Sequence, residues 1–171
     1  MKPVTLPVWQ SAVPARFSEL FPTAAPIWQA QSLTAALRSL GRAFSVELLF
    51  VGECTEEPYF QDVRPSESAA VFVRDVLLCL DGEPVVKARS VCPTDSHNWR
   101  GVLDCGTRPL GERLFDGTLP LLRSDFEFAD LSGRDDFPAQ ALARRSVFDW
   151  HGERLGLMEC FLPTLAHYLP E

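Results

Sequence analysis

The chain has 171 residues, of which 46% are hydrophobic and 23% charged, and its formal net charge is -7. A chain of this length and composition buries roughly two thirds of its unfolded surface in one compact domain, which excludes a disordered polymer. No apolar run is longer than Val76–Leu80, far short of the roughly 20 residues that span a bilayer, and the negative charge repels nucleic acid at long range. We therefore expect a single domain over residues 1–171, with no membrane span and no nucleic-acid partner.

The first 29 residues are expected to be mostly irregular. They are rich in proline, and the prolines interrupt any apolar core that a secretory signal would need, so we expect the protein to stay in the cytoplasm. A short helix is predicted around Ala15–Leu20 within this segment.

A second short helix is predicted at Leu33–Leu40, where four apolar residues share one face. Ser32 is a suitable N-cap for this helix and Gly41 a suitable end. The β-prone run Phe44–Val51 then predicts a strand, and the polar, acidic residues 52–68 predict a surface loop.

Two β-hairpins are the clearest elements. In the segment AVFVRDVLLCLDGEPVVKARSVCP, two β-rich runs flank Asp81 and Gly82, a dipeptide that supplies the positive φ angles of a tight turn. The segment RRSVFDWHGERLGLMECFLP is a second hairpin with His151 and Gly152 at its tip.

The segment between the hairpins is less regular. Residues 94–107 contain turn and loop residues. A two-turn helix is predicted from an N-cap at Thr107, through Pro109 in its first turn, to Gly117. The alternating residues 124–130 predict a strand. Because hairpins dominate, the predicted fold class is α+β, with one antiparallel sheet and helices on one side.

Cysteine and histidine spacing gives no metal site. No two of the five cysteines are closer than 13 residues, which excludes CxxC motifs and predicts reduced structural thiols. The three histidines have no spacing typical of a metal triad. These residues are Cys54, Cys79, Cys92, Cys105, Cys160, His97, His151 and His167.

Two charged residues occupy positions where the strand pattern predicts apolar ones. Arg74 shares a strand face with Phe72 and Val76, and Glu159 shares one with Leu157. A buried charge costs several kcal/mol unless it is paired or binds a ligand. The residues therefore either form a functional site, pair with each other in the core, or lie at a sheet edge.

Other arginines are weaker candidates. Arg89 could add a second cation beside Arg74, or lie on a solvated strand face with Lys87. Since neighbouring strand residues face opposite sides, at most one of Arg144 and Arg145 points inward, and an exposed pair is the alternative.

Four segments in fixed order, FVRDVLLCLDGEPVVKARSVCP, PLGERLF, ARRSVF and ECFLP, resemble bacterial chorismate lyase. The resemblance covers about residues 30–168. It implies one antiparallel sheet and an internal ligand cavity closed by helical flaps. The implied activity converts chorismate to 4-hydroxybenzoate and pyruvate at the first committed step of ubiquinone biosynthesis, without cofactor or metal. We expect a monomer, because the sequence has no extra apolar segment.

The resemblance also implies site residues. The family's carboxylate-binding arginine falls on Arg74 and its glutamate on Glu159, and these are the candidate catalytic residues. The backbone contact at the PLG turn falls on Leu110 with Gly111 beside it, and a flap position falls on Leu33, where the family carries methionine.

Arg74 would clamp the ring carboxylate, and Glu159 would bind the ring hydroxyl as a base or only as a hydrogen-bond acceptor. A second arginine, Arg89 or Arg145, is the candidate for the pyruvyl carboxylate. The alternative function is a ligand-sensing or catalytically inactive hydroxybenzoate-binding domain of the same fold. A sensor would normally follow a winged helix-turn-helix of about 70 residues, and we do not expect the residues printed before this sheet to form one.

Overall fold

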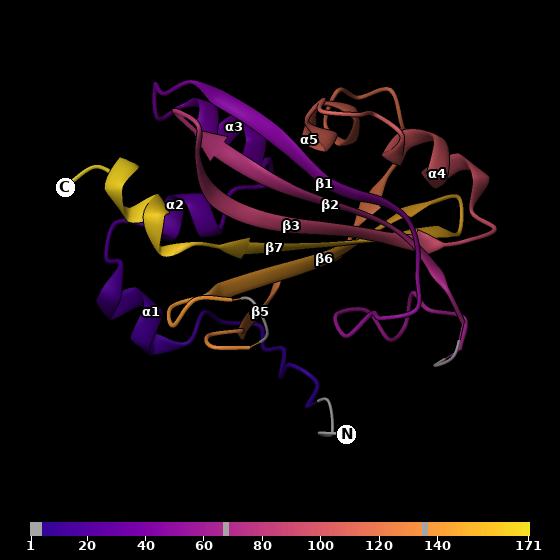
Figure 1. Cartoon of the computed structure of the whole chain (residues 1–171), viewed down its shortest axis with the longest axis horizontal. Helices are drawn as coiled ribbons and strands as arrows, with labels where there is room; N and C mark the ends of the chain where they lie inside the picture. The colour runs from indigo at the N-terminus through magenta and orange to yellow at the C-terminus, as the bar shows by residue number, and fades with distance from the viewer. Residues whose placement is uncertain (1–4, 67–68, 135–136) are drawn as a thin grey trace.

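The core of the fold is one antiparallel sheet of seven strands (Figure 1). The computed structural model describes residues 5–66, 69–134 and 137–171. The strand order is β1-β2-β3-β7-β6-β4, and β5 also pairs with β6. The strands are β1 (Phe44–Cys54), β2 (Val71–Leu80), β3 (Glu83–Pro93), β4 (Leu122–Arg123), β5 (Glu127–Asp130), β6 (Leu142–Trp150) and β7 (Glu153–Phe161). The predicted antiparallel sheet is confirmed.

Both predicted hairpins are present with the predicted turns. Asp81 and Gly82 have φ angles of 49° and 79°, and His151 and Gly152 have φ angles of 50° and 88°. Two consecutive residues with positive φ match the twist of the flanking strands, which is why these short turns fix the pairings β2–β3 and β6–β7.

The helices are short. They are α1 (Ala15–Leu20), α2 (Ala25–Trp28), α3 (Leu33–Arg38), α4 (His97–Leu103), α5 (Leu110–Leu114) and a 3-10 helix, η1 (Pro163–Tyr168). The predicted cap of α3 is confirmed, because the Ser32 hydroxyl accepts a hydrogen bond from the Ala35 N–H at 3.2 Å.

Two predictions about the middle segment were wrong. Helix α4 forms where a loop was expected, because Trp99, Val102 and Leu103 bury one helical face against the sheet. Helix α5 begins at Leu110 with Pro109 as its cap, so Thr107 does not cap it. For α4, contacts distant in sequence outweigh local propensity.

All of the helices pack on one face of the sheet, in two groups (Figure 1). Helices α1, α2, α3 and η1 cover one end around Leu78 and Phe161, while α4 and α5 cover the other end around Phe72 and Phe148. The predicted one-sided placement is therefore confirmed. Within the described residues, no helix is long and apolar enough to cross a membrane.

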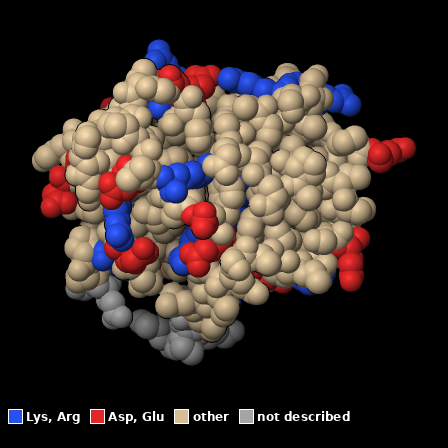
Figure 2. Space-filling view, turned by 180° about the vertical axis from the view of Figure 1, so that it is seen from behind, with Lys and Arg blue, Asp and Glu red and all other residues tan. Residues whose placement is uncertain are grey.

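The other face of the sheet is covered by irregular segments. Phe60 and Val63, from the segment after β1, and Leu131 and Phe137, from the segment after β5, pack onto it. In the view from behind the molecule, basic and acidic side chains lie close together near the middle of the surface rather than in separate fields (Figure 2).

Candidate functional site

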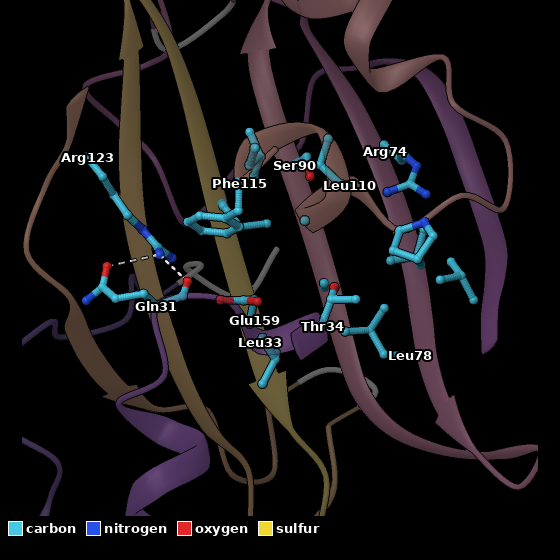
Figure 3. Close-up of a pocket in the computed structure, with 17 residues that line it drawn as sticks. Gln31, Leu33, Thr34, Arg74, Leu78, Ser90, Leu110, Phe115, Arg123 and Glu159 are labelled. Carbon is cyan, nitrogen blue, oxygen red and sulfur yellow. Dashed lines mark hydrogen bonds between the residues drawn. The ribbon is translucent and has the colours of Figure 1, made fainter. Parts of the chain in front are cut away.

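A pocket lies on the helix-covered face, where the two groups of helices meet above the sheet. It contains about 470 Å³ of space free of protein atoms, including the part that opens to solvent. The lining is mainly apolar, with a few polar groups. Its residues are Gln31, Leu33, Thr34, Val46, Arg74, Val76, Leu78, Ala88, Ser90, Pro109, Leu110, Gly111, Leu114, Phe115, Arg123, Leu157 and Glu159 (Figure 3).

Arg74 lies on β2, and only 2% of it is exposed. Its Nη2 donates hydrogen bonds to the carbonyl oxygens of Gly106 at 3.1 Å and Arg108 at 2.8 Å, which hold the guanidinium toward the segment before α5. Its Nε is buried and has no partner among the described residues. Burial lowers the pKa of Arg74, and the nearby Cys105 opposes this shift. The unpaired donor makes Arg74 suited to binding an anion.

Glu159 lies on β7, is 5% exposed and is paired with Arg144 rather than Arg74. The Arg144 Nε donates to Glu159 Oε1 at 2.7 Å. Arg144 is fully buried, and its Nη1 also donates to the carbonyls of Trp28 at 2.9 Å and Ala30 at 2.6 Å. The alternative that Arg74 and Glu159 pair with each other is therefore wrong. Arg144 therefore binds two parts of the protein: the Glu159 carboxylate and the backbone of the segment that leads into α3.

Arg123, on the short strand β4, is a second pocket arginine that the sequence did not single out. Its Nε donates to the Ser146 hydroxyl at 3.0 Å, and its Nη1 donates to the Gln31 carbonyl. The guanidinium carbon lies 4.4 to 5.3 Å from the centres of three aromatic rings, those of Phe115, Phe126 and Phe148. In Figure 3, Arg123 and Arg74 lie on opposite sides of the pocket with Glu159 between them.

The structure brings Leu33, Leu110 and Gly111 together with Arg74 and Glu159 in this pocket. Leu33 is the first residue of α3, and Leu110 and Gly111 are the first two residues of α5.

The two helices approach closely at Gly111. A Cβ atom there would lie 2.8 Å from the Thr34 Oγ1, so only glycine fits without a displacement. Arg38 and Glu112 also join the helices through an exposed ion pair at 2.8 Å.

Arg89 and Arg145 are not brought to the pocket, since both point to the opposite face of the sheet. Arg89 donates two hydrogen bonds to Asp75, at 2.8 and 2.9 Å, and pairs with Glu57 at 3.3 Å. Burial lowers the pKa of Arg89, but the Asp75 and Glu57 carboxylates raise it by a larger amount, so the net shift of this pKa is upward. Arg145 pairs with Glu127 at 2.9 Å. The expectation that either arginine joins Arg74 is corrected here.

A β-bulge explains the position of Arg89. A regular hairpin with Asp81 and Gly82 at its tip would place Arg89 opposite Arg74 and on the same face. The pairing instead shifts by one residue between Leu78 and Cys79, so that Arg74 lies opposite Ser90 and Asp75 opposite Arg89. Shifting a strand by one residue exchanges its two faces.

The sequence did contain a signal for Arg144. In a two-residue hairpin with His151 and Gly152 at the tip, Trp150 pairs with Glu153, and counting back places Arg144 opposite Glu159, as observed. Arg123 gave no comparable signal, because its strand has only two residues and lies at the end of the sheet. Among the residues that the structure describes, no three His, Cys, Asp or Glu side chains form a group suited to a metal ion.

The fold and the pocket define a class of protein: an α+β domain with one antiparallel sheet and a buried arginine and glutamate beneath two short helices. Within that class, the family described as chorismate lyase matches residues 7–168. The chain belongs to the chorismate lyase family, and the resemblance noted from its four sequence segments is confirmed.

Curated relatives agree with this assignment. The chain is 37% identical over 160 residues to a probable chorismate pyruvate-lyase of Bordetella avium (strain 197N), covering 81% of this chain and 79% of that protein. It is 31% identical over 170 residues to probable chorismate pyruvate-lyase 1 of Burkholderia pseudomallei (strain 1710b), covering 91% and 89%.

Solved structures with the same fold come from proteins of other names. The C-terminal domain of the histidine utilization repressor from Pseudomonas syringae pv. tomato str. DC3000 matches with a TM-score of 0.51 at 12% identity, over 71% of this chain and 93% of that one. PhnF from Mycobacterium smegmatis matches with a TM-score of 0.53 at 13% identity, over 79% and 65%. At these identities the likeness concerns the fold alone.

Proposed function

We propose that this protein is a lyase that converts chorismate to 4-hydroxybenzoate and pyruvate, and so supplies the aromatic precursor of ubiquinone. One observation carries the proposal beyond family membership. The pocket holds Arg74, a buried cation with an unpaired donor, together with the Glu159 carboxylate. Chorismate presents a ring carboxylate and a ring hydroxyl, which are the groups that these two residues bind best.

The reaction is an elimination without any change in net oxidation state. The C4–H bond breaks and its electrons enter the ring, while the C3–O bond breaks and its electrons leave with the enolpyruvate oxygen. Enolpyruvate takes up the proton and ketonises to pyruvate. Because the ring becomes aromatic, the chemistry supplies its own driving force.

In this proposal Arg74 binds the ring carboxylate through Nε, and Glu159 accepts a hydrogen bond from the ring hydroxyl. Arg144 holds Glu159 Oε1 at 2.7 Å, so the carboxylate is oriented before the substrate arrives. Preorganised charges in a pocket shielded from water act more strongly than in bulk solvent.

Helices α3 and α5 would act as the flaps of this cavity. Leu33 and Leu110, at the starts of the two helices, are 3% and 7% exposed and line the pocket from above the sheet. The Thr34 side chain of α3 packs closely against the backbone of α5 at Gly111. Ligand entry would therefore require the helices to separate, which gives product release a barrier of its own.

Product inhibition follows from the same contacts. 4-Hydroxybenzoate retains the carboxylate for Arg74 and the hydroxyl for Glu159, so we expect it to remain bound in the pocket and to inhibit turnover. A dissociation constant for the product much larger than the KM for chorismate would contradict this part of the proposal.

The decisive experiment mixes the purified protein with chorismate and follows 4-hydroxybenzoate and pyruvate together. We expect equimolar formation of both, lost in Arg74→Ala and retained in Arg100→Gln. Arg100 is a suitable control because it stacks on Phe72, at 4.6 Å, on the same face of the sheet, but does not line the pocket. Tight binding of 4-hydroxybenzoate without turnover would refute the lyase and favour a hydroxybenzoate-binding domain.

The role of Glu159 is tested by comparing kcat with KM in Glu159→Ala. If the carboxylate acts in the transition state, kcat falls more than substrate binding does. An equal loss in both would mean that Glu159 is only a hydrogen-bond acceptor in the ground state.

A further inference from the structure

Arg123 is a candidate ligand-binding residue, because its contacts with the described residues leave one of its nitrogen donors without a partner. Two of its three nitrogens donate hydrogen bonds within the protein: Nε to the Ser146 hydroxyl and Nη1 to the Gln31 carbonyl. The third, Nη2, is buried and donates to no partner in the described part of the chain. A buried N–H group without an acceptor is costly, and this one belongs to a side chain that lines the pocket.

The surroundings of Arg123 keep it charged and rigid. Three aromatic rings enclose the guanidinium, which limits its freedom to turn away from the pocket. Burial lowers its pKa to about 10, Glu159 opposes that shift and Arg144 adds to it. The side chain therefore remains a cation at neutral pH.

The charges at the pocket do not balance. Glu159 is the one acidic side chain among the described lining residues, and Arg144 beneath it already neutralises it. Within the part of the chain that the structure describes, Arg74 and Arg123 remain as two positive charges without an acidic partner of their own. A ligand with two negative charges would compensate both, whereas a ligand with one would leave a cation buried and unpaired.

The positions of these charges match one ligand orientation. Arg74 and Arg123 lie on opposite sides of the pocket with Glu159 between them (Figure 3). In chorismate the enolpyruvyl ether is attached beside the ring hydroxyl, at the end of the ring away from the ring carboxylate. With the ring carboxylate on Arg74 and the hydroxyl on Glu159, the ring can lie in two orientations about the line joining these groups, and one of them directs the enolpyruvyl group toward Arg123.

We propose that Arg123 binds the enolpyruvyl carboxylate of the substrate through Nη2. This inference rests on the proposed function and assigns to Arg123 the role that strand pattern alone gave to Arg89 or Arg145. Arg123 thereby becomes a residue that distinguishes substrate from product, because 4-hydroxybenzoate has no second carboxylate.

The test compares two ligands in Arg123→Gln. We expect KM for chorismate to rise by about tenfold or more, the effect of losing one hydrogen bond to a charged group. The dissociation constant of 4-hydroxybenzoate should change by less than about twofold, since the product makes no use of this charge. A purely structural role, in which Arg123 only anchors the Gln31 carbonyl and hence α3, would weaken both ligands alike and would overturn the proposal.

Two further variants sharpen the result. Arg123→Lys keeps the charge and should recover part of the loss in KM, which a structural role of the planar fork would not predict. Arg100→Gln removes an arginine that also stacks on a phenylalanine and donates to a backbone carbonyl, at 2.8 Å from Thr94, and should leave both ligands unaffected. Thermal unfolding of each variant confirms that it is folded.

The outcomes separate this inference from the proposed function. If the wild-type protein converts chorismate but Arg123→Gln leaves KM unchanged, the inference fails alone. If KM rises instead in Arg89→Gln or Arg145→Gln, the second carboxylate lies on the other face and the inference is again wrong. If the wild-type protein does not turn chorismate over, the proposed function fails, and calorimetric binding of chorismate and 4-hydroxybenzoate to the same variants still tests Arg123.

Discussion

Replacing Arg144 by methionine should destabilise the protein strongly, although methionine keeps a long, flexible side chain at this position. Glu159, which is only 5% exposed, would lose its cationic partner. The Trp28 and Ala30 carbonyls would each lose a hydrogen-bond donor. Removing one partner of a buried ion pair costs about 3–5 kcal/mol, because the remaining charge is uncompensated. For a chain of this size that loss lowers Tm by about 6–20 °C.

Urea unfolding at pH 7, followed by tryptophan fluorescence, measures this cost. Arg154→Met is the control, because Arg154 forms an exposed pair with Asp62 at 3.6 Å, and we expect it to change stability by less than about 0.5 kcal/mol. Glu159→Gln keeps a neutral oxygen that accepts from Arg144, so we expect it to cost less than Arg144→Met. The double variant should be more stable than the sum of the two losses predicts. A loss below about 1 kcal/mol in Arg144→Met, or simple additivity, would refute the view that this pair is a single buried unit.

Three further predictions concern close packing and thiol access. Gly111→Ala should force α5 away from Thr34 and speed the dissociation of 4-hydroxybenzoate in stopped-flow measurements. The double variant Gly111→Ala/Thr34→Ala should partly restore slow dissociation. An unchanged dissociation rate in Gly111→Ala would show that this contact does not restrain the flaps. Gly156→Ala should cost about 1–3 kcal/mol in urea unfolding, because its Cβ would lie 2.6 Å from the buried Phe60 ring; wild-type stability would show that Phe60 moves aside at little cost. Burial raises the pKa of three thiols, so a thiol reagent followed by mass spectrometry should modify only the two partly exposed cysteines in the native protein, and early labelling of a buried one would contradict the packing described. The buried cysteines are Cys79, Cys92 and Cys160, and the partly exposed ones are Cys54 and Cys105.

Local signals predicted the hairpins and the capped helix correctly because each is fixed by a few neighbouring residues. The turn dipeptides require positive φ angles, and Ser32 caps α3 through a residue three positions away. Local signals did not predict helix α4, because its stability comes from burying Trp99, Val102 and Leu103 against strands distant in sequence. A segment with Asn98 and Gly101 has no strong helix propensity of its own.

The candidate site shows the same division between local and distant determinants. Arg74 and Glu159 stand out as charges within apolar strand faces, a pattern visible in sequence. Arg123 does not stand out, because its surroundings are assembled from three phenylalanines on different parts of the chain. Only the folded structure brings those rings around one guanidinium.

The bulge in the first hairpin decides which arginines reach the pocket. Strands β2 and β3 change register by one residue between Leu78 and Cys79, and the extra residue on the partner strand is Val85. Val85 and Val86 are both fully buried, so the hydrophobic pattern fits either register equally well and cannot reveal the shift. The consequence is chemical, because the shift exchanges the faces of β3 beyond the bulge. It places Ser90 beside Arg74 and pairs Arg89 with Asp75 on the other side of the sheet. The second arginine that lines the pocket is instead Arg123, on β4 at the far end of the sheet.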